Sequence, residues 1–176
     1  MTALVLAGEP GAARGYPPSA LSAITKLIER AGNSEESGGA ITGIYTVLAD
    51  GDDQNDPVVD TARAILDGHI VLSREIAQRG QYPAVDVGAS LSRVMNDIVT
   101  PDHAANARRF RALSATYEAN RDLVMMGAYR QGSDPLLDEA IALHPHMSRF
   151  LAQGYGECVD IATASGQLTE LVGRDA

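Results

Sequence analysis

The sequence predicts a mixed α/β part over residues 1–100, followed by an all-helical part over residues 101–176. Before Thr100, short β-branched apolar runs alternate with helical segments, which is the order of elements in a doubly wound parallel sheet. After Thr100, apolar residues recur only at helical spacing. We therefore expect a domain boundary near residue 100.

A helix and an apolar strand are the first predicted elements. The stretch "RGYPPSALSAITKLIERAG" has apolar residues at helical spacing, and we expect Pro17 and Pro18 to open the helix and Gly32 to close it. The stretch "AITGIYTVLA", residues 40–49, is apolar on both faces and rich in β-branched residues. It predicts a parallel strand that is covered on both sides.

The next elements follow an acidic stretch, "DGDDQNDP", which predicts a solvated loop. Asp56, at the end of this stretch, is expected to cap a helix that runs to Gly68. The runs "HIVLS" (69–73) and "PAVDVG" (83–88) predict two further strands, and "REIAQRG" between them predicts a brief helix.

Helices account for the rest of the chain. Thr100 followed by proline is a strong helix start, and Asp134 followed by proline starts a second helix. We expect Pro145 to interrupt that second helix, because proline removes a backbone donor from a helix interior. The stretch "VDIATASGQLTELV" predicts a last helix.

Composition and charge exclude several classes of function. The formal net charge is −9, with 7 Lys/Arg against 13 Asp/Glu in residues 1–100 and 7 against 10 in residues 101–176. Neither part is basic, so binding of nucleic acid through bulk charge is not expected. The single cysteine, Cys158, cannot form an internal disulfide, which favours a reducing cytoplasm. We expect it to act as a small hydrophobic residue on an apolar helix.

Several catalytic motifs are missing. A phosphate loop needs glycines followed by a lysine, but the only lysine, Lys26, lies in a predicted helix with no glycine before it. The "HPH" stretch predicts exposed imidazoles at His144 and His146, and His69 is expected to be a hydrogen-bonded core residue. The acidic loop lacks the ligand spacing of an EF-hand. No metal site is therefore predicted.

Specific motifs carry a family resemblance. "GEPGAARGYPPSAL", "DGHIVLSREIA", "YPAVDVGASLSRVM" and "NRDLVMMGAYRQGSDPLLDEAI" together resemble the flagellar and type III secretion export ATPases, which are related to the catalytic subunit of rotary ATP synthases. The likeness covers residues 5 to about 155, and the last twenty or so residues match loosely. "GSDP" and "NRDLV" favour the flagellar branch.

The resemblance implies a fold, an assembly and two site residues. Residues 1–100 would be the C-terminal half of a RecA-like parallel-sheet ATPase domain, and residues 101–176 its helical C-terminal domain. Such proteins form homohexamers that bind Mg-ATP between subunits. Tyr82 looks like the ring that lies against adenine, and Arg93 looks like the arginine finger that reaches a neighbouring subunit's ATP. Without the family, a core aromatic and an ordinary ion pair are the simpler alternatives.

The resemblance also implies partners. The acidic loop corresponds to one that faces a central coiled-coil stalk, so Asp52, Asp53, Gln54 and Asp56 are candidate partner-facing residues. A merely solvated turn is the alternative. The helical part resembles the domain that receives export chaperone–substrate complexes. The expected location is the cytoplasm, peripheral to the inner-membrane export gate.

Family features that are absent limit what the chain alone can do. The phosphate loop, the water-activating glutamate and the magnesium-linked aspartate of the family are expected upstream of residue 1. By itself the chain should therefore neither bind ATP tightly nor hydrolyse it. A non-catalytic module that binds stalk or chaperone partners is the alternative function, and a rotary synthase subunit is a third. An in-frame "GxxxxGK[ST]" upstream in the gene would favour the ATPase.

Overall fold

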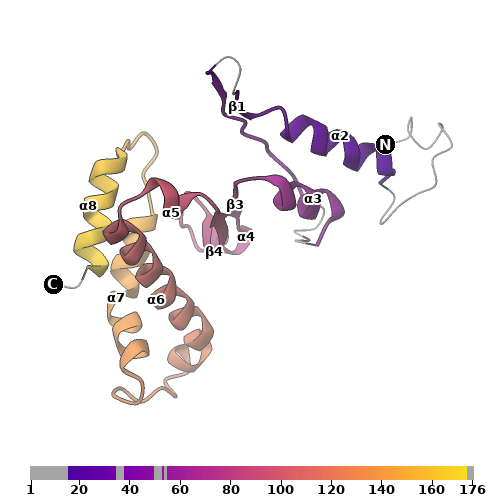
Figure 1. Cartoon of the computed structure of the whole chain (residues 1–176). Helices are drawn as coiled ribbons and strands as arrows, with labels where there is room; N and C mark the ends of the chain where they lie inside the picture. The colour runs from indigo at the N-terminus through magenta and orange to yellow at the C-terminus, as the bar shows by residue number, and fades with distance from the viewer. Residues whose placement is uncertain (1–15, 35–37, 50–52, 54, 174–176) are drawn as a thin grey trace. The chain divides into compact units, whose positions relative to one another are not determined.

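The computed structural model describes residues 16–34, 38–49, 53 and 55–173. The chain forms two compact units, unit 1 (Met1–Asp67) and unit 2 (Gly68–Ala176). Figure 1 labels helices and strands along the ribbon. Packing thus divides the chain at residue 67, and the domain boundary predicted near residue 100 stays a prediction.

Two helices are the longest elements in the described part of unit 1. Helix α2 spans Pro18–Ile28 and α3 spans Pro57–Ile65, and the two lie against each other. Both begin with a proline at the first helical position, as expected from its fixed φ and missing donor. The Asp56 carboxylate caps α3 by accepting from the backbone N–H of Val58 at 2.8 Å. The predicted helix starts are confirmed, although α2 and α3 end three or four residues earlier than expected.

The parallel strand predicted over residues 40–49 is wrong. Only β2, Ala40–Ile41, is a strand, and it pairs antiparallel with β1, Gly32–Asn33. Ile44 and Leu48 are each 92% exposed instead of buried. Among the described residues of unit 1 no other strand lies beside residues 42–49, and a strand needs a neighbour to pair its backbone groups.

Unit 2 begins with a two-stranded sheet. Strand β3, Gly68–Leu72, pairs antiparallel with β4, Val85–Ser92, and the short helix α4, Arg74–Gln78, lies between them in the chain. The register shifts between His69 and Val71. The two predicted strands are confirmed, but their pairing is antiparallel rather than parallel. The short helix α5, Met95–Ile98, follows β4.

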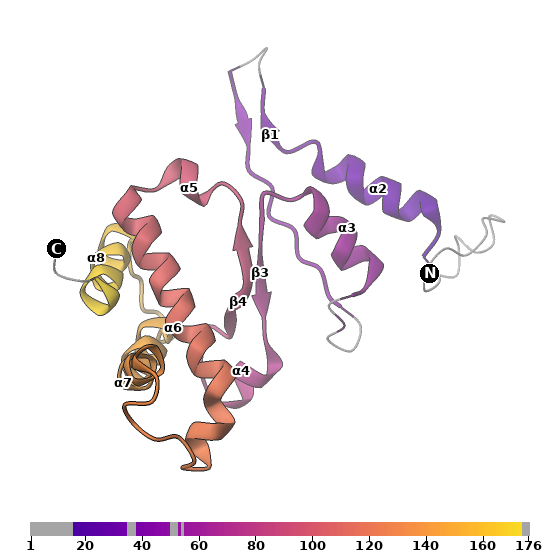
Figure 2. The ribbon, with the colours of Figure 1, turned by 60° about the horizontal axis from the view of Figure 1, so that its bottom comes forward.

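Three helices, visible in Figure 2, complete unit 2 and supply its buried core. They are α6, Pro101–Met125, α7, Pro135–Leu151, and α8, Ile161–Val172. Each begins at a capping side chain: Thr100, Asp134 and Asp160. The buried cluster at their centre comprises Phe110, Leu113, Ala140, Met147, Leu168 and Val172. A mixed α/β segment followed by a helical domain is therefore confirmed as the fold class.

The predicted break at Pro145 is wrong, because α7 continues through this residue to Leu151. Proline removes one helical hydrogen bond and crowds the preceding turn. Ala140 before Pro145 and Met147 after it are both buried in the unit 2 core. Tertiary packing on both sides therefore outweighs the local cost.

Candidate functional site

The two predicted nucleotide residues lie at opposite ends of the β3–β4 ladder. Tyr82 comes three residues before β4, and Arg93 follows its last residue. Strand β4 has eight residues but pairs with only the five residues of β3. The length of β3 sets the length of the ladder, which is roughly 13 Å at the usual rise per residue. The strand falls short of full extension because it contains a bulge. There Asp86 Oδ1 accepts from the backbone N–H of Ala89, and Ser90 Oγ accepts from that of Val71.

Tyr82 combines an exposed side chain with a fixed backbone. The residue is 59% exposed. Its carbonyl oxygen accepts a hydrogen bond from the backbone N–H of Gln153, just beyond α7, at 2.8 Å. The ring can therefore offer a flat apolar face to a ligand while its attachment point stays in place. The alternative that Tyr82 is a core aromatic does not fit this exposure.

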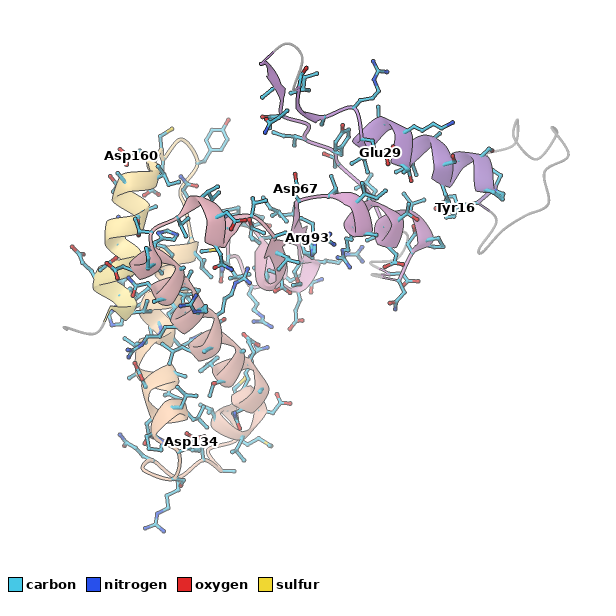
Figure 3. All side chains as sticks on the ribbon, viewed as in Figure 1. Tyr16, Glu29, Asp67, Arg93, Asp134 and Asp160 are labelled. Atoms are coloured by element: carbon cyan, nitrogen blue, oxygen red, sulfur yellow. The ribbon has the colours of Figure 1, made fainter. Side chains whose placement is uncertain are left out.

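Arg93 is exposed and lies in the bend between β4 and α5. Figure 3 shows it beside the small sheet, far from the turn between α6 and α7 that Asp134 marks. A guanidinium stays charged at any ordinary pH and presents donors in a rigid fork that suits phosphoryl oxygens. Its position on the surface allows contact with a neighbouring molecule.

The predicted partner-facing loop is only partly described. Asp52 and Gln54 lie outside the described residues. Asp53 is half-buried, and its Oδ1 accepts from the backbone N–H of Asn55 at 2.9 Å. Asp56 is 5% exposed, because its carboxylate caps α3 and accepts from the Tyr16 hydroxyl at 3.4 Å. Contact between this loop and a stalk stays a prediction.

A groove with a volume of about 700 Å³ lies between α4, β4, α6 and α7 in unit 2. Four of the charged residues at this side of the unit form a connected cluster. Arg79, which directly follows α4, bonds Glu75 of α4 and contacts Glu118 of α6 at 3.5 Å. Arg121 of α6 contacts Glu75 at 3.5 Å. The hydrogen bond and charge of Arg79, followed by those of Arg121, lower the pKa of Glu75. Sequence reasoning missed this cluster. Two features of the sequence could have indicated it: Glu75 and Arg79 are four residues apart, as in a helical ion pair, and Glu118 and Arg121 are charged residues on one helix.

The histidines lie in four different environments. His144 stacks on Tyr117 with ring centroids 3.6 Å apart and planes at 15°, and burial lowers its pKa. The prediction that both imidazoles of "HPH" are exposed is therefore wrong for His144 and confirmed for His146. His69 contacts the Ala89 carbonyl at 3.0 Å but is only half-buried. His103 Nδ1 lies 2.8 Å from the Ser165 hydroxyl.

Cys158 is exposed in the connection that precedes α8, so its predicted place on an apolar helix is wrong. The cap at Asp160 starts α8 only after this residue. Within residues 16–34, 38–49, 53 and 55–173, no group of three or more His, Cys, Asp or Glu side chains is arranged to hold a metal ion. No helix in the same part of the chain has the length and apolar character needed to cross a membrane.

These residues fit part of a nucleotide. The exposed ring of Tyr82 suits a purine base, and the exposed guanidinium of Arg93 suits a phosphoryl group. A loop that cradles phosphates would also need a lysine at a helix start. The only lysine, Lys26, lies in the last turn of α2. The described residues thus include an exposed ring and an exposed guanidinium, and the only lysine does not lie at a helix start.

Two family models match consecutive parts of the chain. The nucleotide-binding domain of the ATP synthase alpha/beta family matches residues 3–92, and the C-terminal domain of the type III secretion ATPase EscN matches residues 99–170. Together with the fold, they define a nucleotide-binding ATPase segment followed by a helical domain. The chain belongs to the ATP synthase alpha/beta family, within its branch of flagellar and type III secretion ATPases.

Curated relatives agree with this placement. The chain is 55% identical over 153 residues to a flagellum-specific ATP synthase of Salmonella typhimurium, covering 87% of this chain and 34% of the relative. It is 51% identical over 165 residues to the flagellum-specific ATP synthase of Pseudomonas aeruginosa, covering 94% and 37%. The chain thus spans about a third of the length of these relatives.

Solved structures show the same relationship. The assembled ATPase EscN of the enteropathogenic E. coli type III secretion system matches with a TM-score of 0.92 at 40% identity, covering 97% of this chain and 41% of EscN. EscN in complex with its central stalk EscO matches with a TM-score of 0.83 at 39% identity, covering 97% and 40%.

Proposed function

We propose that this chain is the part of a flagellum-specific or type III export ATPase that provides an adenine contact, an arginine finger and a partner-facing helical domain. The placement of Tyr82 and Arg93 on the surface, at opposite ends of one ladder, is the observation that supports it best. In this role Tyr82 stacks on the adenine bound by its own subunit. Arg93 donates to the phosphoryl group of ATP held by the neighbouring subunit of a homohexamer.

The chemistry of Arg93 is electrostatic. Mg-ATP bound between two subunits supplies the phosphoryl group that is transferred to water. A guanidinium aimed at this group stabilises the negative charge that develops in the transition state. Since the charge grows only during the reaction, Arg93 acts on turnover more than on ATP binding.

Partners and location follow from the same proposal. EscN is solved as an assembled ATPase and with its central stalk EscO. By similarity, we propose that this chain binds a central coiled-coil stalk, in part through Asp52, Asp53 and Gln54. Asp56 fixes the end of this loop by capping α3. The helical domain receives export chaperone–substrate complexes, in the cytoplasm and peripheral to the inner-membrane export gate.

A non-catalytic binding module is the competing function. In that case the helical domain would bind stalk or chaperone proteins without any part in hydrolysis. The two functions differ in whether Arg93 affects ATP turnover.

The test is Arg93→Ala in a complete export ATPase that contains this sequence. We expect turnover to fall by about 10³-fold or more, the effect typical of an arginine finger, while ATP affinity changes by less than about 3-fold. Phosphate release and equilibrium binding of labelled ATP measure the two quantities. Arg130→Ala, at an exposed arginine near the turn between α6 and α7, is the matched control. Equal losses of turnover and binding, or no loss of turnover, would contradict the finger role.

A further inference from the structure

The segment that carries Tyr82 closes on itself. We call residues 73–84 the α4 loop, because they comprise α4 and the turn that follows it. The backbone N–H of Ser73, at its start, donates to the carbonyl oxygen of Ala84, at its end, at 2.9 Å. Gly80 turns the chain after α4 with a φ of 78°, which favours glycine. The ring of Tyr82 and helix α4 therefore belong to one closed substructure.

The α4 loop is attached to the helices of unit 2 at two places. On one side, the Gln153 N–H beyond α7 donates to the Tyr82 carbonyl. On the other side, Glu75 of α4 meets Arg121 of α6, and Arg79, directly after α4, meets Glu118 of α6. Figure 2 shows α4 beside the C-terminal half of α6, where these contacts lie. We call these four charged residues the α4–α6 charge cluster.

Helix α4 meets α6 through charged pairs at the surface. None of its five residues, all of which are described, is buried, and the groove of about 700 Å³ lies between α4 and the helices. Two ion pairs cross from the α4 loop to α6: Arg79 with Glu118 and Arg121 with Glu75. Charged pairs therefore contribute to the position of α4 relative to α6, beside the half-buried Ile76 and Ala77.

We propose that the α4–α6 charge cluster positions Tyr82, so that the helical domain sets the place of the ring at the nucleotide site. Glu118 and Arg121 are positioning residues that act through α4 and do not touch the nucleotide. This inference rests on the proposed adenine contact of Tyr82. It adds that movement of α6 relative to α4 shifts the ring, which couples the helical domain to nucleotide affinity.

Hydrogen exchange of the 176-residue chain tests the attachment directly. The double variant Glu118→Gln/Arg121→Gln removes the α6 side of the cluster without changing net charge. We expect exchange at the Gln153 amide to rise about 2- to 10-fold, the size expected for losing two exposed ion pairs. The neighbouring Ala152 amide, which donates within α7 to Ser148 and Arg149, serves as the internal reference and should not change.

A matched variant controls for altered surface charge. Arg108→Gln/Asp122→Asn makes the same kinds of change on exposed residues of α6 outside the cluster, and we expect it to leave the Gln153 amide unaffected. If both double variants exchange at the wild-type rate, or if Gln153 and Ala152 accelerate together, the proposed attachment is wrong. Melting temperatures of all variants should agree, because exposed pairs contribute little to global stability.

A second measurement separates this inference from the proposed function. In a complete export ATPase containing this sequence, the cluster variant should raise KM for ATP several-fold with kcat retained, because a misplaced ring weakens binding rather than chemistry. Faster exchange at Gln153 with unchanged KM would overturn the positioning role. Tyr82→Ala is tested beside it, and an unchanged KM in that variant would count against the adenine contact itself.

Discussion

Tyr82 has an exposed ring on a backbone that is held by Gln153. A ring on a mobile backbone would lose conformational entropy on binding a ligand, which weakens affinity. A ring on a backbone that is already held in place loses less entropy. Arg93, at the other end of the ladder, relies on charge and needs only access to a neighbouring molecule. The two residues are therefore suited to different parts of the nucleotide chemistry.

Tyr82→Ala and Tyr82→Phe separate the ring from its hydroxyl. If the residue stacks on adenine, Tyr82→Ala should raise KM for ATP by about 10-fold or more, the usual effect of losing one base–aromatic contact. Tyr82→Phe keeps the flat face and should stay within about 2-fold of the wild type. Steady-state kinetics of a complete export ATPase with each change measures this. A large effect of Tyr82→Phe would assign the role to the hydroxyl instead.

At the scale of elements, α6 and α7 contact each other through both apolar and polar side chains. Phe110 of α6 and Phe150 of α7 have ring centroids 5.7 Å apart, and Tyr117 stacks on His144. Arg109 of α6 also pairs with Glu139 of α7. Because His144 is half-buried in this contact, the interface between the two helices depends on the charge of one imidazole.

Stability should therefore fall as His144 is protonated. Burial, and to a lesser extent Arg121 and Arg79, lower its folded pKa below 6.5, while Glu118 opposes them. As the pH falls, the unfolded chain then binds the proton first, so this contribution is complete above about pH 6.5 and is lost as the pH falls through the lowered pKa. Thermal unfolding between pH 8 and pH 5 measures it. His144→Phe keeps the stacked ring, and a variant with the same pH dependence as wild type would contradict this assignment.

For the molecule as a whole, the core of unit 2 supplies most of the described packing. Leu113 of α6 is fully buried at the centre of a cluster to which α7 and α8 also contribute. Phe110 and Met147 of this cluster also line the groove beside α4. The surface that carries Tyr82 and the charge cluster is thus built onto this core.

Leu113→Ala should destabilise unit 2 strongly. Removing a fully buried leucine side chain costs about 2–5 kcal/mol through lost burial and the cavity that remains. Leu136→Ala on α7 removes the same atoms from a residue that is 46% exposed and should cost less than about 1 kcal/mol. Urea unfolding of the two variants gives the difference. Equal losses would show that the described core is not the one that holds the unit together.

Local chemistry made much of this fold predictable. Asp56, Thr100 and Asp134 cap the helices whose starts the sequence predicts, because a capping side chain bonds amides two or three residues away. Tyr82 and Arg93 were found through family resemblance, since nothing in their immediate neighbours distinguishes a nucleotide contact from an ordinary surface residue. The resemblance supplied their proposed roles, and the structure supplied their exposure.

Contacts between distant residues were decided by tertiary structure alone. The antiparallel pairing of β3 with β4, the stacking of His144 on Tyr117 and the link from Glu75 to Arg121 each join segments well separated in the chain. The sequence by itself determined where helices start, because capping depends on near neighbours. Only the folded chain decided which apolar runs are covered and which charges meet, because burial and ion pairing require a partner that the local sequence does not contain.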